Sequence, residues 1–284
     1  MRRPLLALAL TSTLALAGCD SLRVFFPKQE YETAPVELPA DLKAPALLLF
    51  TKTNGFRHTE GIPAGVALVS EIAKRRGWSV FHTESGGVFN DAQLAKFQAA
   101  MWHQVSGDVL TEEQRDSFKR WLEAGGGFVG VHGAGGDGEY AWRWYVETLI
   151  GAQFIGHTMG PQFQTATWRV ENAAHPATKN LPASWQHEEE IYSFDASVRS
   201  KPGVEVLVSV DETTYSPQLK FLWQDRSIAM GADHPMVWRQ CIGRGRALYS
   251  AIGHQAKTYD VPEVKALTEG ALAWAMREEG EGCE

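Results

Sequence analysis

The sequence has few cysteines and fewer positive than negative charges. Its 284 residues contain 27 Lys and Arg against 34 Asp and Glu, and two of the arginines directly follow Met1, in a segment that we expect to be removed. The remaining 25 positive and 34 negative side chains give a net charge of −9, so nucleic acid is not an expected partner. Apart from Cys19, the cysteines are Cys241 and Cys283, which could pair in an oxidising compartment. The sequence alone leaves that pairing open.

The apolar run from Leu5 to Leu16 is too short, and too closely followed by polar residues, to span a membrane. Arginines before it and small residues after it are typical of a secretory signal, which we place at residues 1–18. Leu16-Ala17-Gly18-Cys19 also resembles the lipobox of bacterial lipoproteins, which implies a lipid on Cys19 and a location on the periplasmic side of a bacterial membrane. Asp20 resembles an inner-membrane retention signal. The alternative is an ordinary secretory signal with an incidental cysteine.

Neither an internal repeat nor a second linker divides the rest of the chain. Residues 19–44 contain several prolines and lack helical or strand periodicity, so we interpret them as the lipidated cysteine and a tether between membrane and domain. Residues 45–279 are expected to form one α/β domain, followed by a short tail at 280–284.

Strand-like and helix-like segments alternate in the first half of this domain. The apolar run Ala46–Phe50 predicts a strand buried on both faces, and Thr111 with Gln114 predicts a capping box for a helix that ends at Gly125. The alternation predicts a flavodoxin-like parallel sheet with helices on both faces, and the strand-rich texture beyond Gly151 predicts a mixed extension of that sheet. The expected strands include 46–50, 78–81, 99–103, 164–170, 188–194, 204–208, 228–232 and 247–252, and the expected helices include 63–76, 91–97 and 264–276.

The stretch GGGFVGVHGAGG, Gly125 to Gly136, has the pattern of a strand that turns sharply and raises one side chain above the end of a sheet. Such elbows usually carry Ser or Cys, whereas this one carries His132. Ligands of open parallel sheets bind beyond the carboxyl ends of the strands, so His58, His132 and His254 are expected near one crevice. His175, which precedes Pro176, is interpreted as structural.

The stretch HEEEIYSF, His187 to Phe194, places acidic residues beside aromatic ones. If the stretch is extended, Glu190 and Tyr192 share one face, and a carboxyl group held there would have a raised pKa, as a general base near neutrality requires. One slip of register would exchange Glu189 for Glu190 in the crevice. The alternative is a solvent-facing edge strand with ordinary charges.

Local metal-binding motifs such as His-Glu-x-x-His, His-x-His and zinc-type Cys/His sets are absent. A candidate divalent metal site would therefore have to be assembled from distant loops, with His58, His132, Glu190 and His254 as its ligands; otherwise no cofactor is expected. Among the ten tryptophans, Trp144 falls outside the helical spacing of its apolar neighbours, which makes it a candidate for binding a sugar ring.

Six ordered motifs in this sequence resemble those of the ThuA-like (trehalose utilisation) family over about residues 46–275. The resemblance implies a fold similar to that of class I glutamine amidotransferases. It matches His132 to the position of their catalytic cysteine, which argues against glutaminase chemistry. The motifs are Thr53-Asn54-Gly55-Phe56-Arg57-His58, Val129-Gly130-Val131-His132-Gly133-Ala134, Leu149-Ile150-Gly151-Ala152-x-Phe154-x-Gly156-His157, His175-Pro176-Ala177-Thr178, Glu189-Glu190-Ile191-Tyr192-x-Phe194 and Gly243-x-Gly245-Arg246-Ala247-x-Tyr249-x-x-Ile252-Gly253-His254.

The resemblance also implies a carbohydrate ligand, since family members occur with disaccharide catabolism. We therefore expect an enzyme that acts by acid/base chemistry on a keto-sugar or glycoside through isomerisation, elimination or hydrolysis. The alternative is a membrane-tethered module that binds a sugar or a partner without catalysis. The candidate catalytic residues are His58, His132, Glu190, Tyr192 and His254, and the candidate ligand-binding residues are Asp137, Trp144, His157 and Glu189.

Overall fold

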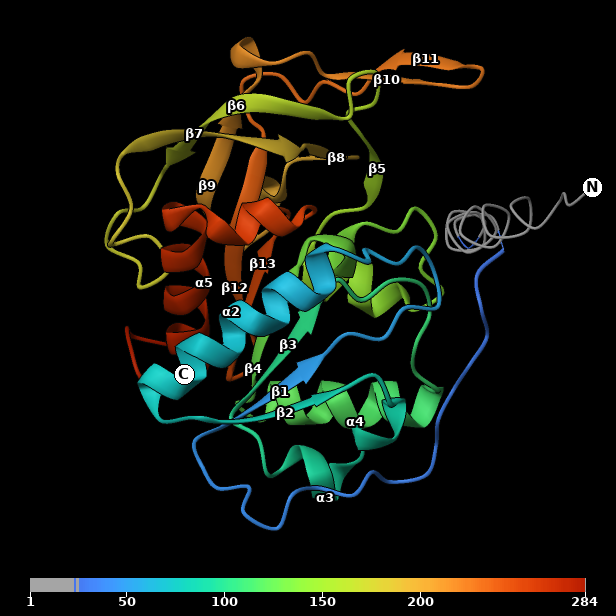
Figure 1. The fold of residues 1–284 in the computed structure, drawn as a ribbon, viewed down its shortest axis with the longest axis vertical. Helices are drawn as coiled ribbons and strands as arrows, with labels where there is room; N and C mark the ends of the chain where they lie inside the picture. Colours follow the sequence, from blue (N-terminus) through green and yellow to red (C-terminus); the bar gives the residue numbers. More distant parts are fainter. Residues whose placement is uncertain (1–22, 24–25, 284) are drawn as a thin grey trace, which may run out of the picture.

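A computed structural model describes residue 23 and residues 26–283 of the chain. The predicted signal at 1–18 and the lipidation at Cys19 lie outside these residues. Its main feature is a nine-stranded sheet in the order β2-β1-β3-β4-β13-β12-β9-β6-β7 (Figure 1). The strands of this sheet are β1 (Ala46–Phe50), β2 (Ser79–Thr83), β3 (Ala99–His103), β4 (Gly127–Val131), β6 (Phe163–Val170), β7 (Ser184–Glu190), β9 (Glu205–Asp211), β12 (Pro235–Ile242) and β13 (Gly245–Ser250).

The first five strands in that order are all parallel. β1 lies between β2 and β3, β4 pairs with β3, and β13 pairs with the other side of β4. β1, β3 and β4 are buried along their whole length, because helices cover both faces of the sheet. The predicted parallel core is confirmed.

The other four strands continue the sheet in antiparallel pairs, β13 with β12, β12 with β9, β9 with β6 and β6 with β7. Two reversals of direction separate β13 from β9, and two more separate β9 from β7. β7 therefore points the same way as the parallel strands, and its carboxyl end lies at the same edge of the sheet. Figure 1 shows β6 and β7 crossing over that edge above the parallel strands.

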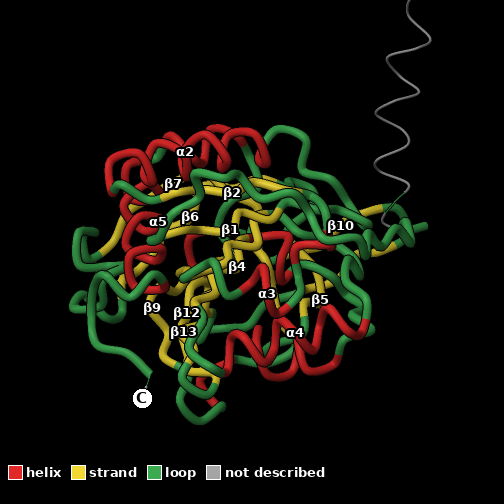
Figure 2. Tube along the Cα trace, turned by 90° about the horizontal axis from the view of Figure 1, so that it is seen from below, coloured by secondary structure: helices red, strands yellow, loops and turns green. Residues whose placement is uncertain are grey.

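Helices cover both faces of the sheet (Figure 2). α2 (Gly61–Arg76) and α5 (Pro262–Ala275) lie on one face, and α3 (Asp91–Leu94) and α4 (Glu112–Glu123) lie on the other. α4 begins with the predicted capping box, in which the Thr111 hydroxyl accepts from the Gln114 backbone and the Gln114 side chain accepts from the Thr111 backbone. The predicted α/β fold with a mixed extension of the sheet is confirmed. No helix among the described residues is long and apolar enough to cross a membrane.

The prediction of a strand at residues 228–232 is wrong. The backbone N–H groups of Met230 and Gly231 donate to the Glu212 carboxylate at 2.5 and 2.9 Å, and so they do not pair with a strand. The strand residues lie just before this segment, in a hairpin of β10 (Gln218–Phe221) and β11 (Gln224–Ser227) beside the short sheet of β5 (Phe154–His157) and β8 (Tyr192–Phe194).

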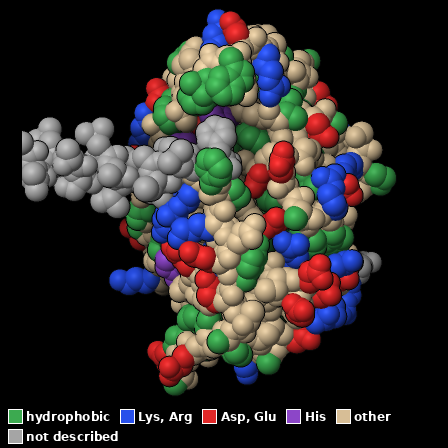
Figure 3. Space-filling view, turned by 90° about the vertical axis from the view of Figure 1, so that its right-hand side faces the viewer, with side chains coloured by type: hydrophobic (Ala, Val, Ile, Leu, Met, Phe, Trp, Pro, Cys, Tyr) green, Lys and Arg blue, Asp and Glu red, His purple; other side chains and the backbone are tan. Residues whose placement is uncertain are grey.

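The tip of the β10–β11 hairpin is apolar. Phe221, Leu222 and Trp223 are 48%, 69% and 84% exposed. Figure 3 shows hydrophobic side chains gathered at the top of this face, where the hairpin projects, with histidine side chains just below them. The hairpin lies beside the end of β5, whose last residue is the candidate His157.

The segment interpreted as a tether contacts the domain from Lys28 onward. The Lys28 N–H donates to the Asn54 carbonyl at 2.7 Å, Lys52 forms an ion pair with Glu32, and the Gln93 side chain donates to the Val36 carbonyl at 2.6 Å. These residues form no helix or strand, as predicted from their lack of periodicity. They nevertheless follow the surface of the domain instead of running free from it.

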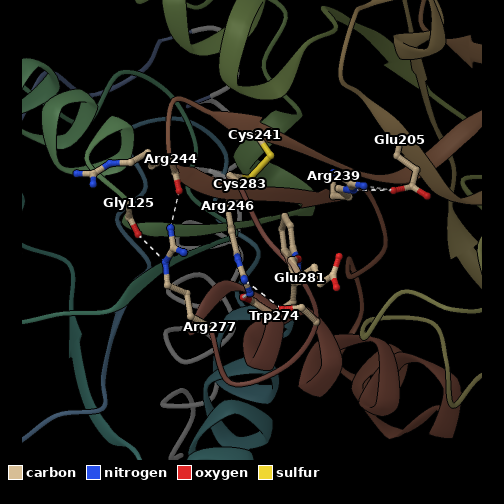
Figure 4. The surroundings of a disulfide bond; sticks show 11 residues. Gly125, Glu205, Arg239, Cys241, Arg244, Arg246, Trp274, Arg277, Glu281 and Cys283 are labelled. Atoms are coloured by element: carbon tan, nitrogen blue, oxygen red, sulfur yellow. Dashed lines mark hydrogen bonds and ion pairs between the residues drawn. A yellow bond between two sulfur atoms is a disulfide. The ribbon is translucent and has the colours of Figure 1, made fainter.

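A disulfide between Cys241 and Cys283 ties the end of the chain to β12 (Figure 4). The Arg246 guanidinium, next to this bond, donates to the carbonyls of Trp274 and Gly280 at 2.7 and 3.1 Å. The pairing that the sequence left open is therefore present. The segment interpreted as a tail is bound to the sheet as far as Cys283.

Loss of this disulfide should lower the free energy of unfolding. The bond closes a loop of 42 residues, and the loss of entropy that it imposes on the unfolded chain corresponds to about 2–4 kcal/mol. We expect this loss in the Cys241→Ser/Cys283→Ser double variant, measured by urea unfolding. Reducing agent should destabilise the wild type to a similar extent and leave the double variant unchanged. Equal stability of oxidised and reduced wild type would contradict this prediction.

Two buried histidines, His103 at the end of β3 and His175 between β6 and β7, should make the fold sensitive to acid. Burial lowers the pKa of His103 to about 4, and burial together with the charge of Arg239 lowers the pKa of His175 to about 4. Between pH 6.5 and pH 4 the unfolded chain therefore binds protons that the folded chain does not bind. The free energy of unfolding should fall as the pH drops through this window, by about 2 kcal/mol for His103 between pH 8 and pH 5.

The His103→Gln variant tests this prediction. The Gln amide can still donate to the Gly61 carbonyl, which the His103 ring nitrogen contacts at 3.1 Å, but it does not titrate. Urea unfolding at pH 8 and pH 5 should show a smaller loss of stability in the variant than in the wild type. An identical loss in both proteins would rule out His103 as a source of the acid sensitivity.

Candidate functional site

Four strand ends bring three histidines and one glutamate together. His58 lies in the loop after β1, His132 follows β4, Glu190 ends β7 and His254 follows β13. One ligand atom from each of the four lies within 4.8 Å of the corresponding atoms of the others. We call these four residues the His–Glu cluster. They converge because β1, β4, β13 and β7 all point the same way.

The elbow after β4 orients the His132 ring. His132 has a φ of 48°, so the backbone turns sharply there and carries the side chain to the end of the sheet. A Cβ at Gly135 would lie 2.5 Å from the Tyr249 ring, so only glycine fits this turn. His132 Nδ1 lies 2.7 Å from the Ala251 carbonyl oxygen, which can only accept, so Nδ1 carries the proton. In the tautomer that this contact selects, the lone pair of Nε2 faces the cluster.

The two oxygens of the Glu190 carboxylate contact different residues. Oε1 accepts from Gln162 Nε2 at 2.5 Å and lies 3.1 Å from His157 Nδ1. Oε2 lies 3.0 Å from His254 Nδ1 and 3.3 Å from His132 Nε2. One oxygen is thus satisfied by donors outside the cluster, and the other points into it.

The prediction of a raised carboxyl pKa at this position is wrong for Glu190. Burial alone would raise the pKa, but the close contacts with the His132 and His254 rings and the charge of His157 hold the Glu190 pKa well below its usual range. Glu190 is therefore an ionised carboxylate at neutral pH. The pKa of His254 is raised, because its hydrogen bond with Glu190 outweighs the opposing effect of burial.

Glu189 lies behind the cluster and holds the loop that carries His254. Its carboxylate accepts from the backbone N–H groups of Gly253 and His254 at 3.1 and 3.2 Å and from the Thr258 hydroxyl at 2.9 Å. The sequence left open whether Glu189 or Glu190 faces the crevice. In the structure Glu190 faces the cluster, and Glu189 positions His254. Glu188 lies nearer the surface and pairs with Lys257.

His58 completes the cluster from the opposite side. Its ring centroid lies 4.9 Å from that of His132 and 4.6 Å from that of His254. His58 Nδ1 is buried and has no hydrogen-bond partner among the described residues. Burial and the neighbouring histidines hold the His58 pKa well below its usual range, so the ring is neutral at physiological pH.

The remaining candidate residues divide into two groups. The Tyr192 ring packs against His132 with centroids 4.2 Å apart, and burial and the charge of Glu190 raise its pKa well above the usual range. His157 contacts Glu190 directly, as described above. In contrast, Trp144 packs against Trp142 and Lys119 on the α4 side of the sheet, and Asp137 lies in the loop after the elbow, where it accepts from the Glu139 N–H at 2.9 Å. The structure does not bring Trp144 or Asp137 into contact with the cluster.

The sequence analysis missed two glutamines that support the site. Gln162 binds Glu190, and Gln104 joins the elbow to the His254 loop by accepting from the Gly133 N–H at 3.2 Å and donating to the Gly253 carbonyl. Gln104 directly follows β3 and has a φ of 58°, which is uncommon for a residue other than glycine. Amide side chains carry no sequence signature of their own. Only their positions could have drawn attention to them, Gln104 directly after a strand and Gln162 between a Gly-Pro pair and a strand.

A sequence model of the ThuA family, described as trehalose utilisation, matches residues 46–275. The chain belongs to the ThuA family. The match covers nearly the whole domain and includes every residue of the His–Glu cluster. Membership indicates a carbohydrate-related role for this ThuA domain and leaves its reaction open. No curated protein matches the chain significantly.

Solved structures support the same family. A ThuA-like protein from Bacteroides uniformis is 25% identical to this ThuA domain, with a TM-score of 0.71 over 84% of this chain and 94% of that one. A ThuA-like protein from Parabacteroides merdae is 16% identical, with a TM-score of 0.58 over 82% of this chain and 90% of that one. The second likeness shows the fold alone.

Proposed function

We propose that this ThuA domain catalyses proton transfer at a carbon next to the carbonyl group of a keto-sugar or related glycoside. The observation that carries the proposal is the His–Glu cluster itself, three imidazoles and one ionised carboxylate at the edge of a parallel sheet. A carbonyl group acidifies the neighbouring C–H bonds, so a positioned base and a positioned proton donor suffice to begin isomerisation or elimination. No covalent nucleophile is required, in keeping with histidine at the elbow.

The geometry suggests a role for each member of the cluster. His132 Nε2, whose lone pair is fixed by the hydrogen bond of Nδ1, would accept the proton from carbon. His254, paired with Glu190, would donate a hydrogen bond to the carbonyl oxygen and stabilise the enolate that forms. Tyr192 keeps its proton at neutral pH and packs on the His132 ring, so its expected effect is to orient that base.

Exchange of substrate hydrogen with solvent tests this function. The mature chain, residues 19–284 with Cys19→Ser, would be incubated in deuterated water with a panel of 3-keto glycosides and followed by proton NMR. We expect loss of the signal from the hydrogen next to the carbonyl, because abstraction followed by return of a solvent deuteron replaces it. Line broadening without exchange or product, over the whole panel, would instead indicate a protein that binds such sugars without catalysis.

A further inference from the structure

We propose that the His–Glu cluster is a binding site for one divalent transition-metal ion. The inference rests on the geometry of the four side chains and not on the identity of the substrate. Only the role of the ion in the reaction, given below, rests on the proposed function.

Three cluster atoms already form the triangle that a metal ion requires. His132 Nε2 and His254 Nδ1 lie 3.2 Å apart, and Glu190 Oε2 lies 3.3 Å from the first and 3.0 Å from the second. An ion about 2.0–2.1 Å from each ligand atom in tetrahedral geometry would place neighbouring ligand atoms roughly 3.3–3.4 Å apart, so the three atoms would separate by only about 0.1–0.4 Å. The fourth ligand atom, from His58, lies within 4.8 Å of the other three.

The hydrogen bonds around the cluster leave its inward-facing atoms short of protons. His132 Nδ1 is bound to the Ala251 carbonyl, so Nε2 faces inward as a lone pair beside the Glu190 oxygen. One proton, on His254 Nδ1, is then shared between two acceptors, His132 Nε2 and Glu190 Oε2. A cation at the centre would satisfy all three atoms at once, together with the buried His58 ring, which lacks a hydrogen-bond partner among the described residues for its Nδ1.

The surrounding residues hold the ligands as outer-shell partners do in metal sites. The Ala251 carbonyl fixes the tautomer of His132, and Gln162 and His157 hold the outer oxygen of Glu190. Glu189 fixes the backbone of His254. The Glu190 carboxylate faces the three imidazoles, and its negative charge favours a cation among them.

The ligand set also selects the class of metal. Three imidazole nitrogens and one carboxylate oxygen suit Zn²⁺, Co²⁺, Fe²⁺ or Ni²⁺ and are poor ligands for Mg²⁺ or Ca²⁺, which prefer sets of oxygen atoms. With the ion bound, His132 and His254 would serve as ligands in place of the acid and base roles given above. The ion would polarise the sugar carbonyl, and the hydroxide formed from a bound water, whose pKa the ion lowers, would accept the proton from carbon and become water.

Titration of the metal-free protein with Zn²⁺ tests the site. After treatment with EDTA and desalting, the mature chain should bind one equivalent of Zn²⁺ with a dissociation constant below about 1 µM, measured by calorimetry and by equilibrium dialysis with elemental analysis. The His132→Asn and Glu190→Gln variants should each bind at least about 100-fold more weakly. His175→Asn changes a histidine outside the cluster and should bind as the wild type does. Mg²⁺ should not compete.

Two results would overturn the proposal: no saturable Zn²⁺ binding below 1 mM, or binding equally tight in both cluster variants. If a variant does not fold, the absorption spectrum of Co²⁺ in the wild type provides the second measurement, since nitrogen-rich tetrahedral coordination gives intense visible bands. Exchange activity that persists in the EDTA-treated protein without Zn²⁺ binding would overturn the metal site and leave the proposed function standing. Tight Zn²⁺ binding without exchange on any sugar would support the metal site and count against the proposed function.

Discussion

Replacing Glu190 with Gln should lower the rate of the proposed proton exchange by about 10²–10⁴-fold without unfolding the protein. The carboxylate accepts on both of its oxygens, from Gln162 on one side and from His254 on the other, and His157 Nδ1 lies 3.1 Å from the first oxygen. An amide of the same shape has only one oxygen, so either orientation turns its NH₂ group toward donors. His254 then loses the partner that raises its pKa, and the cluster loses its negative charge.

His132→Asn should lower the exchange rate to a similar extent. The shorter Asn side chain places no imidazole nitrogen opposite Glu190 Oε2. The readout for both variants is the rate at which the substrate signal disappears in deuterated water. Circular dichroism and urea unfolding establish that the fold is retained.

His175→Asn is the matched control for the two cluster variants. His175 is also a buried histidine, but its Nδ1 accepts from the Ala177 N–H at 3.1 Å, a bond that the Asn oxygen can replace. This variant should exchange at the wild-type rate. If the Glu190→Gln and His132→Asn variants still exchanged at the wild-type rate, the cluster would have no role in the reaction.

Replacing Glu189 with Ala should destabilise the protein by about 3–5 kcal/mol and disturb the site at the same time. Four donors lose their acceptor in this variant. They are the backbone N–H groups of Glu190, Gly253 and His254 and the hydroxyl of Thr258, and all four lie near or within the buried interior. A buried donor without a partner costs about 1–3 kcal/mol, and the loop that carries His254 can recover part of this cost only by moving toward water.

Glu188→Ala provides a control one residue away in the same strand. Glu188 pairs with Lys257 at the surface, and an exposed pair of this kind contributes at most about 1 kcal/mol. Urea unfolding should therefore separate the two variants clearly. Amide hydrogen exchange over residues 251–258 should increase in Glu189→Ala alone, a change that a general loss of stability elsewhere would not produce. Equal stability of the two variants would show that Glu189 does not anchor this loop.

The parallel part of the fold could be predicted from the sequence because its signals are local. The apolar run of β1, the capping box at Thr111 and the glycine-rich elbow each depend on a few adjacent residues. The rule that ligands bind at the carboxyl ends of parallel strands then brings His58, His132 and His254 together. The structure places all three within the cluster.

The antiparallel part could not be predicted in the same way, because strand order depends on contacts between distant segments. No local pattern shows that β7 lies at the end of the sheet and yet crosses back over the parallel strands. Nor does a local pattern show that the strand breaks at Ile191, directly after the two glutamates, between β7 and β8.

The prediction for Trp144 failed for a different reason. Its helical spacing correctly set it apart from its apolar neighbours, but spacing does not show what lies beside an outward residue. Trp142 and Lys119 contact the Trp144 ring on the α4 side of the sheet.

The position of β13 in the sheet has a consequence for how the chain is made. β13 is the last strand in the sequence, yet it lies between β4 and β12 and joins the parallel part to the antiparallel part. Until residues 245–250 have been synthesised, β4 and β12 each present an unpaired edge, which is a template for pairing with another chain. The same strand leads directly to His254. A chain interrupted before this point therefore lacks both the strand that closes the sheet and the final member of the cluster, so completion of the fold and assembly of the site depend on one late segment.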